Sequence, residues 1–326
     1  MNNIANLSQQ ERQELFSETA KMMHTTNAII EKDFWVVWIL DKIFLDKKLN
    51  KILMFKGGTS LSKVFNLIGR FSEDIDLILD WNMVTNEDPN KKRSKTKQDK
   101  YNKEVNENAK AYIRDELLPT ISELLAPLCS CKINEDDEFN INVSYPTTFD
   151  DKYLRPEILL EIGPLASWLP YSNFEITSYV AEYFPEHFKK SRTNVNAIVA
   201  SRTFWEKATI LHQEANRNVE KPLPTRYSRH YYDLAIMAKS DVKIEALADM
   251  ELLERVIDFK NKFYPASWAK FDEARPSTLK LVPPEYRLEA LKKDYKAMEH
   301  MIFDKKLTFE EIVKILQELE TEVNNI

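Results

Sequence analysis

Apolar residues recur at helical spacing over much of the chain. In the first half, this pattern predicts helices over residues 8–24, 28–45 and 99–125. From residue 203 onwards nearly all of the sequence has the same pattern, and we expect helices at 203–217, 228–239, 244–263, 284–303 and 308–323. Ser8 and Thr308 are each followed three residues later by a glutamate, which predicts a capping box at the start of the first and last of these helices.

Shorter apolar runs lie between the helices and predict strands. These runs are 51–55, 74–79, 139–144 and 156–162, and the stretches 174–184 and 195–200 are typical of mixed strand and loop. Thr59 is expected to cap a helix that Gly69 ends. We therefore expect a mixed α+β fold, with two N-terminal helices and a mixed sheet flanked by helices over residues 1–200, and a helical domain over residues 201–326.

The composition limits where such a protein works. Of the 326 residues 43% are hydrophobic, enough for a large core, but no apolar run is long enough to cross a bilayer. Only two cysteines occur, Cys129 and Cys131, and the first residues do not resemble a secretory signal. We expect a cytoplasmic protein without membrane contact. The net charge of −6 excludes a chain that is basic all over, as generic nucleic-acid binders are.

Glycine is rare, and its distribution is uneven. Of the four glycines, Gly57, Gly58 and Gly69 fall within thirteen residues. A Gly-Gly pair in such a chain indicates a positive φ or close approach of the backbone to a ligand. The pair separates a predicted strand from a predicted helix, where free N–H groups favour phosphate. The side chains nearby that would add contacts to a phosphate are Lys56, Thr59, Ser60 and Arg70.

Two aspartates follow on the next predicted strand. Because strand side chains alternate, Asp74 and Asp76 share one face, while Ile75 and Leu77 point to the other. Like charges so close together repel unless a cation neutralises them, and Mg²⁺ prefers carboxylates together with phosphate oxygens. The spacing predicts a site for Mg²⁺, or Mn²⁺ in its place, beside a nucleoside triphosphate, with Ser72 as a further nucleotide contact.

A third carboxylate has a similar setting. In the run 156–162, Glu161 lies on the strand face opposite to Leu160 and Ile162, which makes it the natural partner of the aspartate pair. A solvated strand face explains Glu161 equally well. The Gly-Gly turn and the Asp-x-Asp pair are also common as purely structural features. Their occurrence together, in this order, favours a catalytic site.

Two charges in the helical half lie close to apolar faces. Lys207 is three residues from Phe204 and four from Leu211, at the edge of a buried helix face. Asp233 shares a helix face with Ile236. A structural ion pair between the two charges fits this placement, and so does a lysine that binds an anion while the aspartate orients it.

These segments together resemble a known family. The sequences IEKD, FKGGTSLSK, RFSEDIDL, RTFWEKATIL and RHYYDLAIM, spread over residues 28–240, resemble the AbiEii/AbiGii nucleotidyltransferase-like toxins of type IV toxin–antitoxin and phage abortive-infection systems. The first motif of the family falls on Gly57, Gly58, Thr59, Asp74 and Asp76. Its lysine motif falls on Lys207, its final aspartate on Asp233, and Glu161 is the best match to its intermediate motif.

The resemblance implies a nucleotidyltransferase fold and an enzyme that moves a nucleotide from an NTP to an acceptor with release of pyrophosphate. Some relatives modify the 3′ end of tRNA, so RNA is the expected acceptor, and a cognate antitoxin protein is the expected partner. The catalytic residues would be Asp74, Asp76, Glu161, Lys207 and Asp233. The nucleotide would contact Lys56, Gly57, Gly58, Thr59, Ser60, Arg70 and Ser72.

Two other functions stay open at this point. A kinase-like phosphotransferase, acting on a protein or a small molecule, would release a nucleoside diphosphate instead of pyrophosphate. A catalytically silent module would bind a nucleotide or a partner without turnover. The adjacent charges of Asp74 and Asp76 argue against the silent module, because it has no need for two neighbouring carboxylates.

One basic segment departs from the acidic balance of the chain. Residues 89–103 carry seven Lys or Arg against one Asp. A solvated loop and helix start explains this run. The alternative is that it binds phosphates of the RNA acceptor, because release of counterions makes local basic clusters effective even in an acidic protein.

Overall fold

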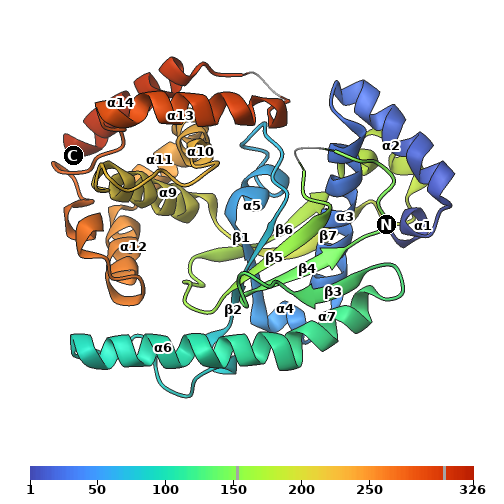
Figure 1. The fold of residues 1–326 in the computed structure, drawn as a ribbon, viewed down its shortest axis with the longest axis horizontal. Helices are drawn as coiled ribbons and strands as arrows, with labels where there is room; N and C mark the ends of the chain where they lie inside the picture. The colour runs from blue at the N-terminus through green and yellow to red at the C-terminus, as the bar shows by residue number, and fades with distance from the viewer. Residues whose placement is uncertain (152–153, 304–305) are drawn as a thin grey trace. The chain divides into compact units, whose positions relative to one another are not determined.

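The computed structural model describes residues 1–151, 154–303 and 306–326 (Figure 1). The chain divides into two compact units. The first comprises Met1–Phe65 and Phe71–Ile198, and the second comprises Asn66–Arg70 and Val199–Ile326. Within the described ranges, no helix combines the length and the apolar character needed to cross a bilayer.

The described part of the first unit contains a seven-stranded sheet with the order β3-β4-β5-β2-β1-β7-β6. Its strands are β1 (Leu53–Lys56), β2 (Ile75–Leu79), β3 (Ser130–Ile133), β4 (Asn140–Ser144), β5 (Glu157–Gly163), β6 (Tyr171–Thr177) and β7 (Arg192–Ile198). Strands β2 and β5 pair in parallel, as do β1 and β7, and the other neighbours are antiparallel. The sheet is therefore mixed, and with its flanking helices it confirms the predicted α+β class.

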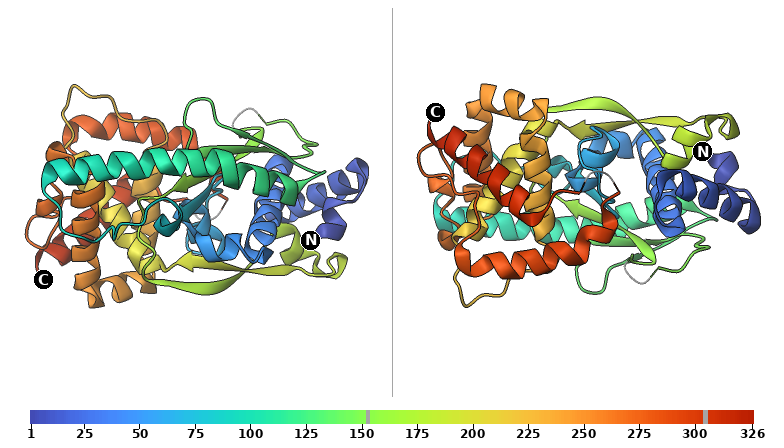
Figure 2. Two further views of the ribbon diagram at one scale, coloured as in Figure 1. Left: turned by 90° about the horizontal axis from the view of Figure 1, so that it is seen from below. Right: turned by 90° about the horizontal axis from the view of Figure 1, so that it is seen from above.

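The helices of the first unit surround this sheet. They are α1 (Asn2–Ala5), α2 (Gln9–Met23), α3 (Asn27–Leu45), α4 (Leu49–Ile52), α5 (Gly57–Lys63), α6 (Lys95–Tyr112), α7 (Leu118–Leu125) and α8 (Tyr179–Tyr183). A π-helical turn at Ile113–Leu117 joins α6 to α7. The three form one long rod, drawn in teal to green in Figure 2. Short 3₁₀ turns at Trp81–Met83 and Pro185–His187 complete the unit.

The two faces of the sheet differ in character. On one face, alternate residues of the central strands are apolar and fully buried, for example Leu77 of β2 and Leu160 of β5. On the other face, the register places Lys56, Asp76 and Glu161 side by side on β1, β2 and β5. The polar row shares this face with buried apolar residues such as Met54 and Ile78, which belong to a core cluster of their own.

Helix α3 is the centre of the first unit, because nearly all of its residues are buried. Three consecutive charged residues, Glu31, Lys32 and Asp33, are among them. Glu31 accepts hydrogen bonds from the N–H groups of Thr148 and Phe149. Buried charges are stable only with partners, so each of the three ties α3 to another segment.

The second unit is helical. Its helices are α9 (Ala200–Ala215), α10 (Ser228–Ala238), α11 (Asp241–Ala248), α12 (Met250–Phe263), α13 (Glu285–Met298) and α14 (Phe309–Asn324), with 3₁₀ turns at Ser267–Ala269, Phe271–Glu273 and Glu299–Met301. The short segment Asn66–Arg70 also belongs to it. Phe303 donates its N–H to the Gly69 carbonyl at 3.0 Å, and Arg70 forms a β-bridge with Ile302.

The capping boxes at Ser8 and Thr308 are confirmed, but several predicted boundaries are wrong. Helix α5 begins at Gly57, and Thr59 lies inside it without capping it. The Thr59 hydroxyl instead donates to the Asp74 carbonyl. The helix ends at Lys63, before Gly69.

Two further differences concern the number of elements. The region predicted as one helix over 244–263 forms two, because the Asp249 side chain accepts from the N–H of Leu252 and starts α12 anew. Strand β3 was not predicted. Its residues are exposed or half-buried, and the strand pairs with β4 alone, so its apolar signal is weak.

The ion pair between Asp33 and Lys63 supplies a test of this fold. Both side chains are buried, and Lys63 Nζ lies 2.5 Å from Asp33 Oδ1. Lys63→Met leaves a buried carboxylate without its counter-charge, and we expect the free energy of unfolding in urea to fall by about 3–5 kcal/mol. The exposed Lys47→Met is the control and should change stability by less than about 0.5 kcal/mol.

The double variant Asp33→Asn/Lys63→Met removes both charges and should recover part of this loss. If the double variant loses the sum of the two single losses, the pair does not couple α3 to α5.

Candidate active site

The turn before α5 is built around Gly57. Its φ of +81° lies in the left-handed region that side chains disfavour. The Asp76 side chain lies directly against this glycine, so that a Cβ at Gly57 would be 2.5 Å from the Asp76 carboxylate carbon. Both the backbone turn and the room for the carboxylate therefore require the absence of a side chain.

The hydroxyls of Thr59 and Ser60 point into the protein. Thr59 donates to the Asp74 carbonyl, and Ser60 donates to the Gly57 carbonyl at 2.8 Å. Both residues are buried. The two bonds fix the start of α5 against the residue that precedes β2. Both hydroxyl protons are thus donated to backbone carbonyls.

Asp74 immediately precedes β2 and is half-buried. Its Oδ1 atom is buried and has no hydrogen-bond partner in the described part of the chain. Burial raises the pKa of this carboxyl, and the charges of Glu73 and Asp76 raise it further, while Arg155 and Lys32 act in the opposite direction. A buried carboxylate oxygen without a donor, next to a second carboxylate, suits a hard divalent cation.

A buried ion pair fixes the backbone next to Asp74. Lys32 of α3 donates from Nζ to Glu73 Oε2 at 2.8 Å and to the Arg155 carbonyl at 2.8 Å. The Arg155 N–H donates to the same Glu73 oxygen at 3.1 Å. Glu73 thereby joins α3, the segment before β5 and the segment before β2. These bonds restrict the backbone on which Asp74 stands.

Glu161 lies beside Asp76 on the same face of the sheet. The register of the parallel pair β2 and β5 sets these two residues opposite each other, and Lys56 faces Asp76 from β1. Asn140 of β4 faces Glu161 from the other side. Side chains opposed in this way are neighbours on one face. The sheet thus presents a row of lysine, aspartate, glutamate and asparagine.

This row does not form a closed metal cluster. Over the ranges that the structure describes, no group of three or more His, Cys, Asp and Glu side chains converges as a metal site. Asp74 and Asp76 therefore form a pair rather than a triad with Glu161. A carboxylate pair is a common way to hold Mg²⁺, whose other ligands are water and substrate phosphate oxygens.

The second unit contains its own charged cluster. Asp233 of α10 receives two hydrogen bonds from Arg70, from Nε at 2.7 Å and from Nη2 at 2.8 Å. On the other side of this carboxylate, Nζ of Lys207 in α9 lies 2.8 Å from Asp233 Oδ2. All three side chains are buried. The ion pair between Lys207 and Asp233 that the sequence left open is present, and Arg70 is its third member.

This cluster has an excess of positive charge. Burial disfavours the charged form of Asp233, but Arg70 and Lys207 outweigh it and keep the pKa of that carboxyl below its usual range. Burial lowers the pKa of Lys207, and the charges of Arg70 and Arg229 add to this effect against Asp233. Two buried cations, Arg70 and Lys207, share one carboxylate here, which favours the approach of an anion.

The predicted site residues fall into both units. The first unit carries Lys56, Gly57, Gly58, Thr59, Ser60, Ser72, Asp74, Asp76 and Glu161, and the second carries Arg70, Lys207 and Asp233. The sequence did not single out the roles of Lys32 and Glu73. The available signal was the run Glu31-Lys32-Asp33 inside an otherwise apolar helix, where charges must have buried partners.

Gly57 provides a test of the turn. Gly57→Ala would adopt an unfavourable φ and its methyl group would overlap the Asp76 carboxylate, so we expect a loss of at least about 2 kcal/mol in unfolding free energy. Gly163→Ala is the matched control, because nothing lies within 4 Å of a Cβ there. Equal urea midpoints for the two variants would contradict the described packing of Gly57 against Asp76.

Comparison with known proteins places the chain among nucleotidyltransferase toxins. Residues 38–315 match the family described as nucleotidyl transferase AbiEii toxin, type IV toxin–antitoxin system. This range extends further towards the C-terminus than the expected 28–240, and it leaves out the buried Glu31-Lys32-Asp33 run. The comparison with curated proteins gave no match.

Two solved structures are similar over nearly their whole length. The nucleotidyltransferase toxin MenT4 of Mycobacterium tuberculosis H37Rv has 14% identity and a TM-score of 0.49, covering 95% of this chain and 97% of that one. JHP933 of Helicobacter pylori has 16% identity and a TM-score of 0.37, covering 92% and 98%. The family match spans most of the chain, so the protein belongs to the AbiEii family of nucleotidyltransferase toxins of type IV toxin–antitoxin systems.

Proposed function

We propose that this nucleotidyltransferase transfers a nucleotide from an NTP to the 3′ end of an RNA acceptor, with tRNA as the expected RNA. The observation that carries the proposal is the buried Asp74 oxygen without a partner, beside the Asp76 carboxylate packed against Gly57. Acidic groups held together in this way are suited to a cation and a triphosphate.

Asp74 and Asp76 are the residues that would hold Mg²⁺, or Mn²⁺ in its place. A divalent cation bound there supplies neutralisation of the negative charge on the triphosphate and the departing pyrophosphate. The acceptor hydroxyl oxygen bonds to the α-phosphorus of the NTP, and the bond from that phosphorus to the pyrophosphate oxygen breaks. We assign acceptance of the hydroxyl proton to one of the carboxylates Asp74, Asp76 and Glu161.

The nucleotide would be held by the turn and by cations. The N–H groups from Gly57 to Ser60 belong to the first turn of α5 and would contact the phosphates, and we assign further contacts to the side chains of Lys56 and Ser72. In the second unit, we assign a phosphate contact to Lys207. Asp233 would orient Lys207, and Arg70 would keep Asp233 ionised. These roles follow from the surplus of cations over carboxylates in that cluster.

Membership of a type IV system also bears on partners and setting. We propose a cognate antitoxin protein as the biological partner, and a role in toxin–antitoxin control or defence against phage. Since NTPs and tRNA are found in the cytoplasm, we place the activity there.

The reaction class and the acceptor are tested in one experiment. The protein is incubated with Mg²⁺, total cellular RNA and each NTP, labelled at either the α- or the γ-phosphate. We expect label from the α-position in RNA, and label from the γ-position in pyrophosphate. Transfer of γ-label to any acceptor would indicate the kinase-like alternative. A bound nucleotide without turnover would indicate the silent module.

Asp76→Asn tests the carboxylate pair. The residue is half-buried and lies in the polar row of the sheet, so we expect the fold to persist and transfer to fall by at least tenfold, because a cation ligand is lost. Asp258→Asn makes the same chemical change at an exposed position and should leave the rate unaltered. Transfer by Asp76→Asn at more than about a tenth of the parent rate would refute the assignment.

Lys207 and Asp233 are distinguished by removing each in turn. Asp233→Ala leaves Arg70 and Lys207 buried without a counter-charge and should cost about 3–5 kcal/mol of unfolding free energy. Lys207→Ala leaves the two-bonded Arg70–Asp233 pair intact, so its melting temperature should fall much less while NTP turnover is lost. Equal destabilisation by both variants, with activity retained in the folded protein, would show a purely structural pair.

A further inference from the structure

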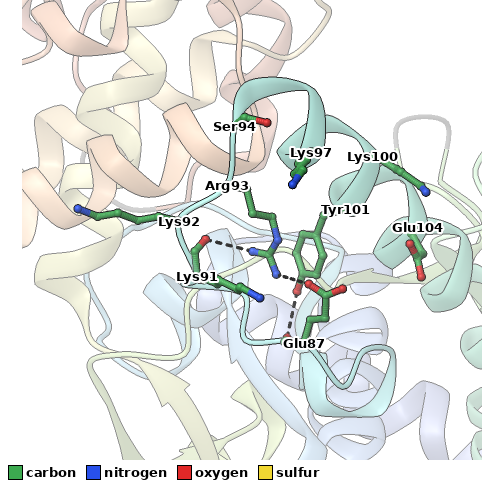
Figure 3. Close-up of a pocket in the computed structure, with 9 residues that line it drawn as sticks. All are labelled: Glu87, Lys91, Lys92, Arg93, Ser94, Lys97, Lys100, Tyr101 and Glu104. Carbon is green, nitrogen blue, oxygen red and sulfur yellow. Dashed lines mark hydrogen bonds and ion pairs between the residues drawn. The ribbon is translucent and has the colours of Figure 1, made fainter.

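A basic pocket lies in the first unit, between the segment that follows β2 and the start of α6. It has a volume of about 380 Å³ and is lined by Glu87, Lys91, Lys92, Arg93, Ser94, Lys97, Lys100, Tyr101 and Glu104 (Figure 3). Five of these side chains are basic and two are acidic. In a protein with a net charge of −6, such a local excess of positive charge is a marked departure.

Arg93 fixes the shape of this pocket. Its guanidinium donates to the carbonyls of Asp88 and Lys91, at 2.9 and 3.2 Å, and to the Glu87 carboxylate at 2.9 Å. It also lies over the Tyr101 ring, 3.7 Å from the centroid. Only 6% of the Arg93 side chain is exposed. The basic segment is therefore folded onto α6 by a buried arginine, which a simple solvated loop does not require.

The lysines at the start of α6 occupy electrostatically unfavourable positions. Helix α6 begins at Lys95 with no acidic residue in its first turn, and the Ser94 side chain makes no capping hydrogen bond. Positive side chains are unfavourable at the positive end of a helix dipole. Lys97 and Lys100, three residues apart, lie on the same side of α6 and repel each other. An anion in the pocket would relieve both effects.

The chemistry of the lining selects a phosphate. Tyr101 is the one aromatic residue that lines the pocket, and with 6% of its surface exposed under Arg93 it offers no face on which a base can stack. Recognition of a free nucleotide or of an unpaired base commonly uses such stacking. Lysine ammonium groups bind backbone phosphates without it.

The place of the pocket along the chain shows which part of an acceptor it would contact. Asp76 lies at the N-terminal end of β2, whereas the segment leading to Lys91 leaves from the opposite end, after Leu79. The basic segment therefore moves away from the aspartates as it leaves the strand. Phosphates bound here would belong to a part of the RNA other than its reacting end.

We propose that Lys91, Lys92, Lys97 and Lys100, arranged around Arg93, bind backbone phosphates of the RNA acceptor away from its 3′ end. The inference rests on the proposed RNA acceptor and adds where that acceptor is held. In this inference, the contacts between basic side chains and RNA phosphates are made by the residues that line the pocket, and Arg93 fixes the shape of that pocket.

The test compares two full-length variants of equal charge. The pocket variant carries Gln at Lys91, Lys92, Lys97 and Lys100, and keeps Arg93. The control carries Gln at the exposed lysines Lys21, Lys47, Lys51 and Lys189. Both are also made with Asp76→Asn, so that binding of deacylated total tRNA is measured without turnover, from 50 to 300 mM NaCl. Melting temperatures verify that both are folded.

We expect the pocket variant to bind tRNA about tenfold or more weakly at low salt, with a slope of log K against log salt reduced by about one or more. The control should bind within about twofold of the parent. With Asp76 intact, the pocket variant should raise the KM for tRNA and leave the KM for NTP and transfer to a trinucleotide acceptor unchanged.

Three results would overturn the inference. An equal salt slope in the pocket and control variants, while the parent still labels tRNA, removes the pocket but leaves the proposed function intact. A second result is that millimolar inorganic phosphate or AMP competes with tRNA for the parent protein, while the pocket variant binds tRNA as tightly as the parent. This result would assign the pocket to a free phosphate. A parent protein that labels no RNA removes the proposed acceptor and this inference together.

Discussion

Two buried lysine–carboxylate pairs on α3 hold the candidate site of the first unit in place. Asp33 binds Lys63 at the end of α5, and Lys32 binds Glu73 next to Asp74. The Gly57 turn and the carboxylate pair are therefore fixed to the same helix from two directions. Ion pairs of this kind contribute little net stability compared with apolar packing, but breaking one partner is costly. Their value here is geometric, because a catalytic constellation requires rigid support.

This support also explains why two like charges tolerate each other. Asp74 directly precedes β2 and Asp76 lies on it, and the Asp76 carboxylate fits against a residue without a side chain. Burial is the main cause of the raised pKa of Asp74, and the negative charges of Glu73 and then Asp76 raise it further. A rigid arrangement that keeps like charges close together is characteristic of a site prepared for a ligand.

Sequence patterns predicted what local chemistry decides. The capping boxes, the strand that follows Asp74 and the alternation around Glu161 all depend on residues close together in the chain, and the structure contains them. The function of Thr59 depends on the Asp74 carbonyl, which the folded sheet brings to it, so a local rule assigned the wrong role. Likewise, the Arg70–Asp233 pair joins residues 163 positions apart and has no local signature.

The physical pattern of the sequence predicted the fold class, and the family resemblance predicted the reaction. Apolar periodicity and composition were sufficient for the α+β class, because burial governs both. The reaction was assigned from five short motifs, which together identify a family although each alone is common. Lys32 and Glu73 lie within two of these motifs, but their pairing was missed by both approaches, since neither reports which buried charges meet in space. Only the contacts of Lys32 with Glu73 and Arg155 show that link.

The division of the chain has a consequence for how the molecule unfolds. Residues Asn66–Arg70 belong to the second unit, although they are inserted between α5 and β2 of the first. The polypeptide thus passes between the units three times, after Phe65, after Arg70 and after Ile198. Loss of the α5–β2 region would withdraw Arg70 from Asp233, and a fragment beginning at Val199 would lack it altogether. The second unit therefore depends for its buried Arg70–Asp233 pair on a segment that lies between two elements of the first.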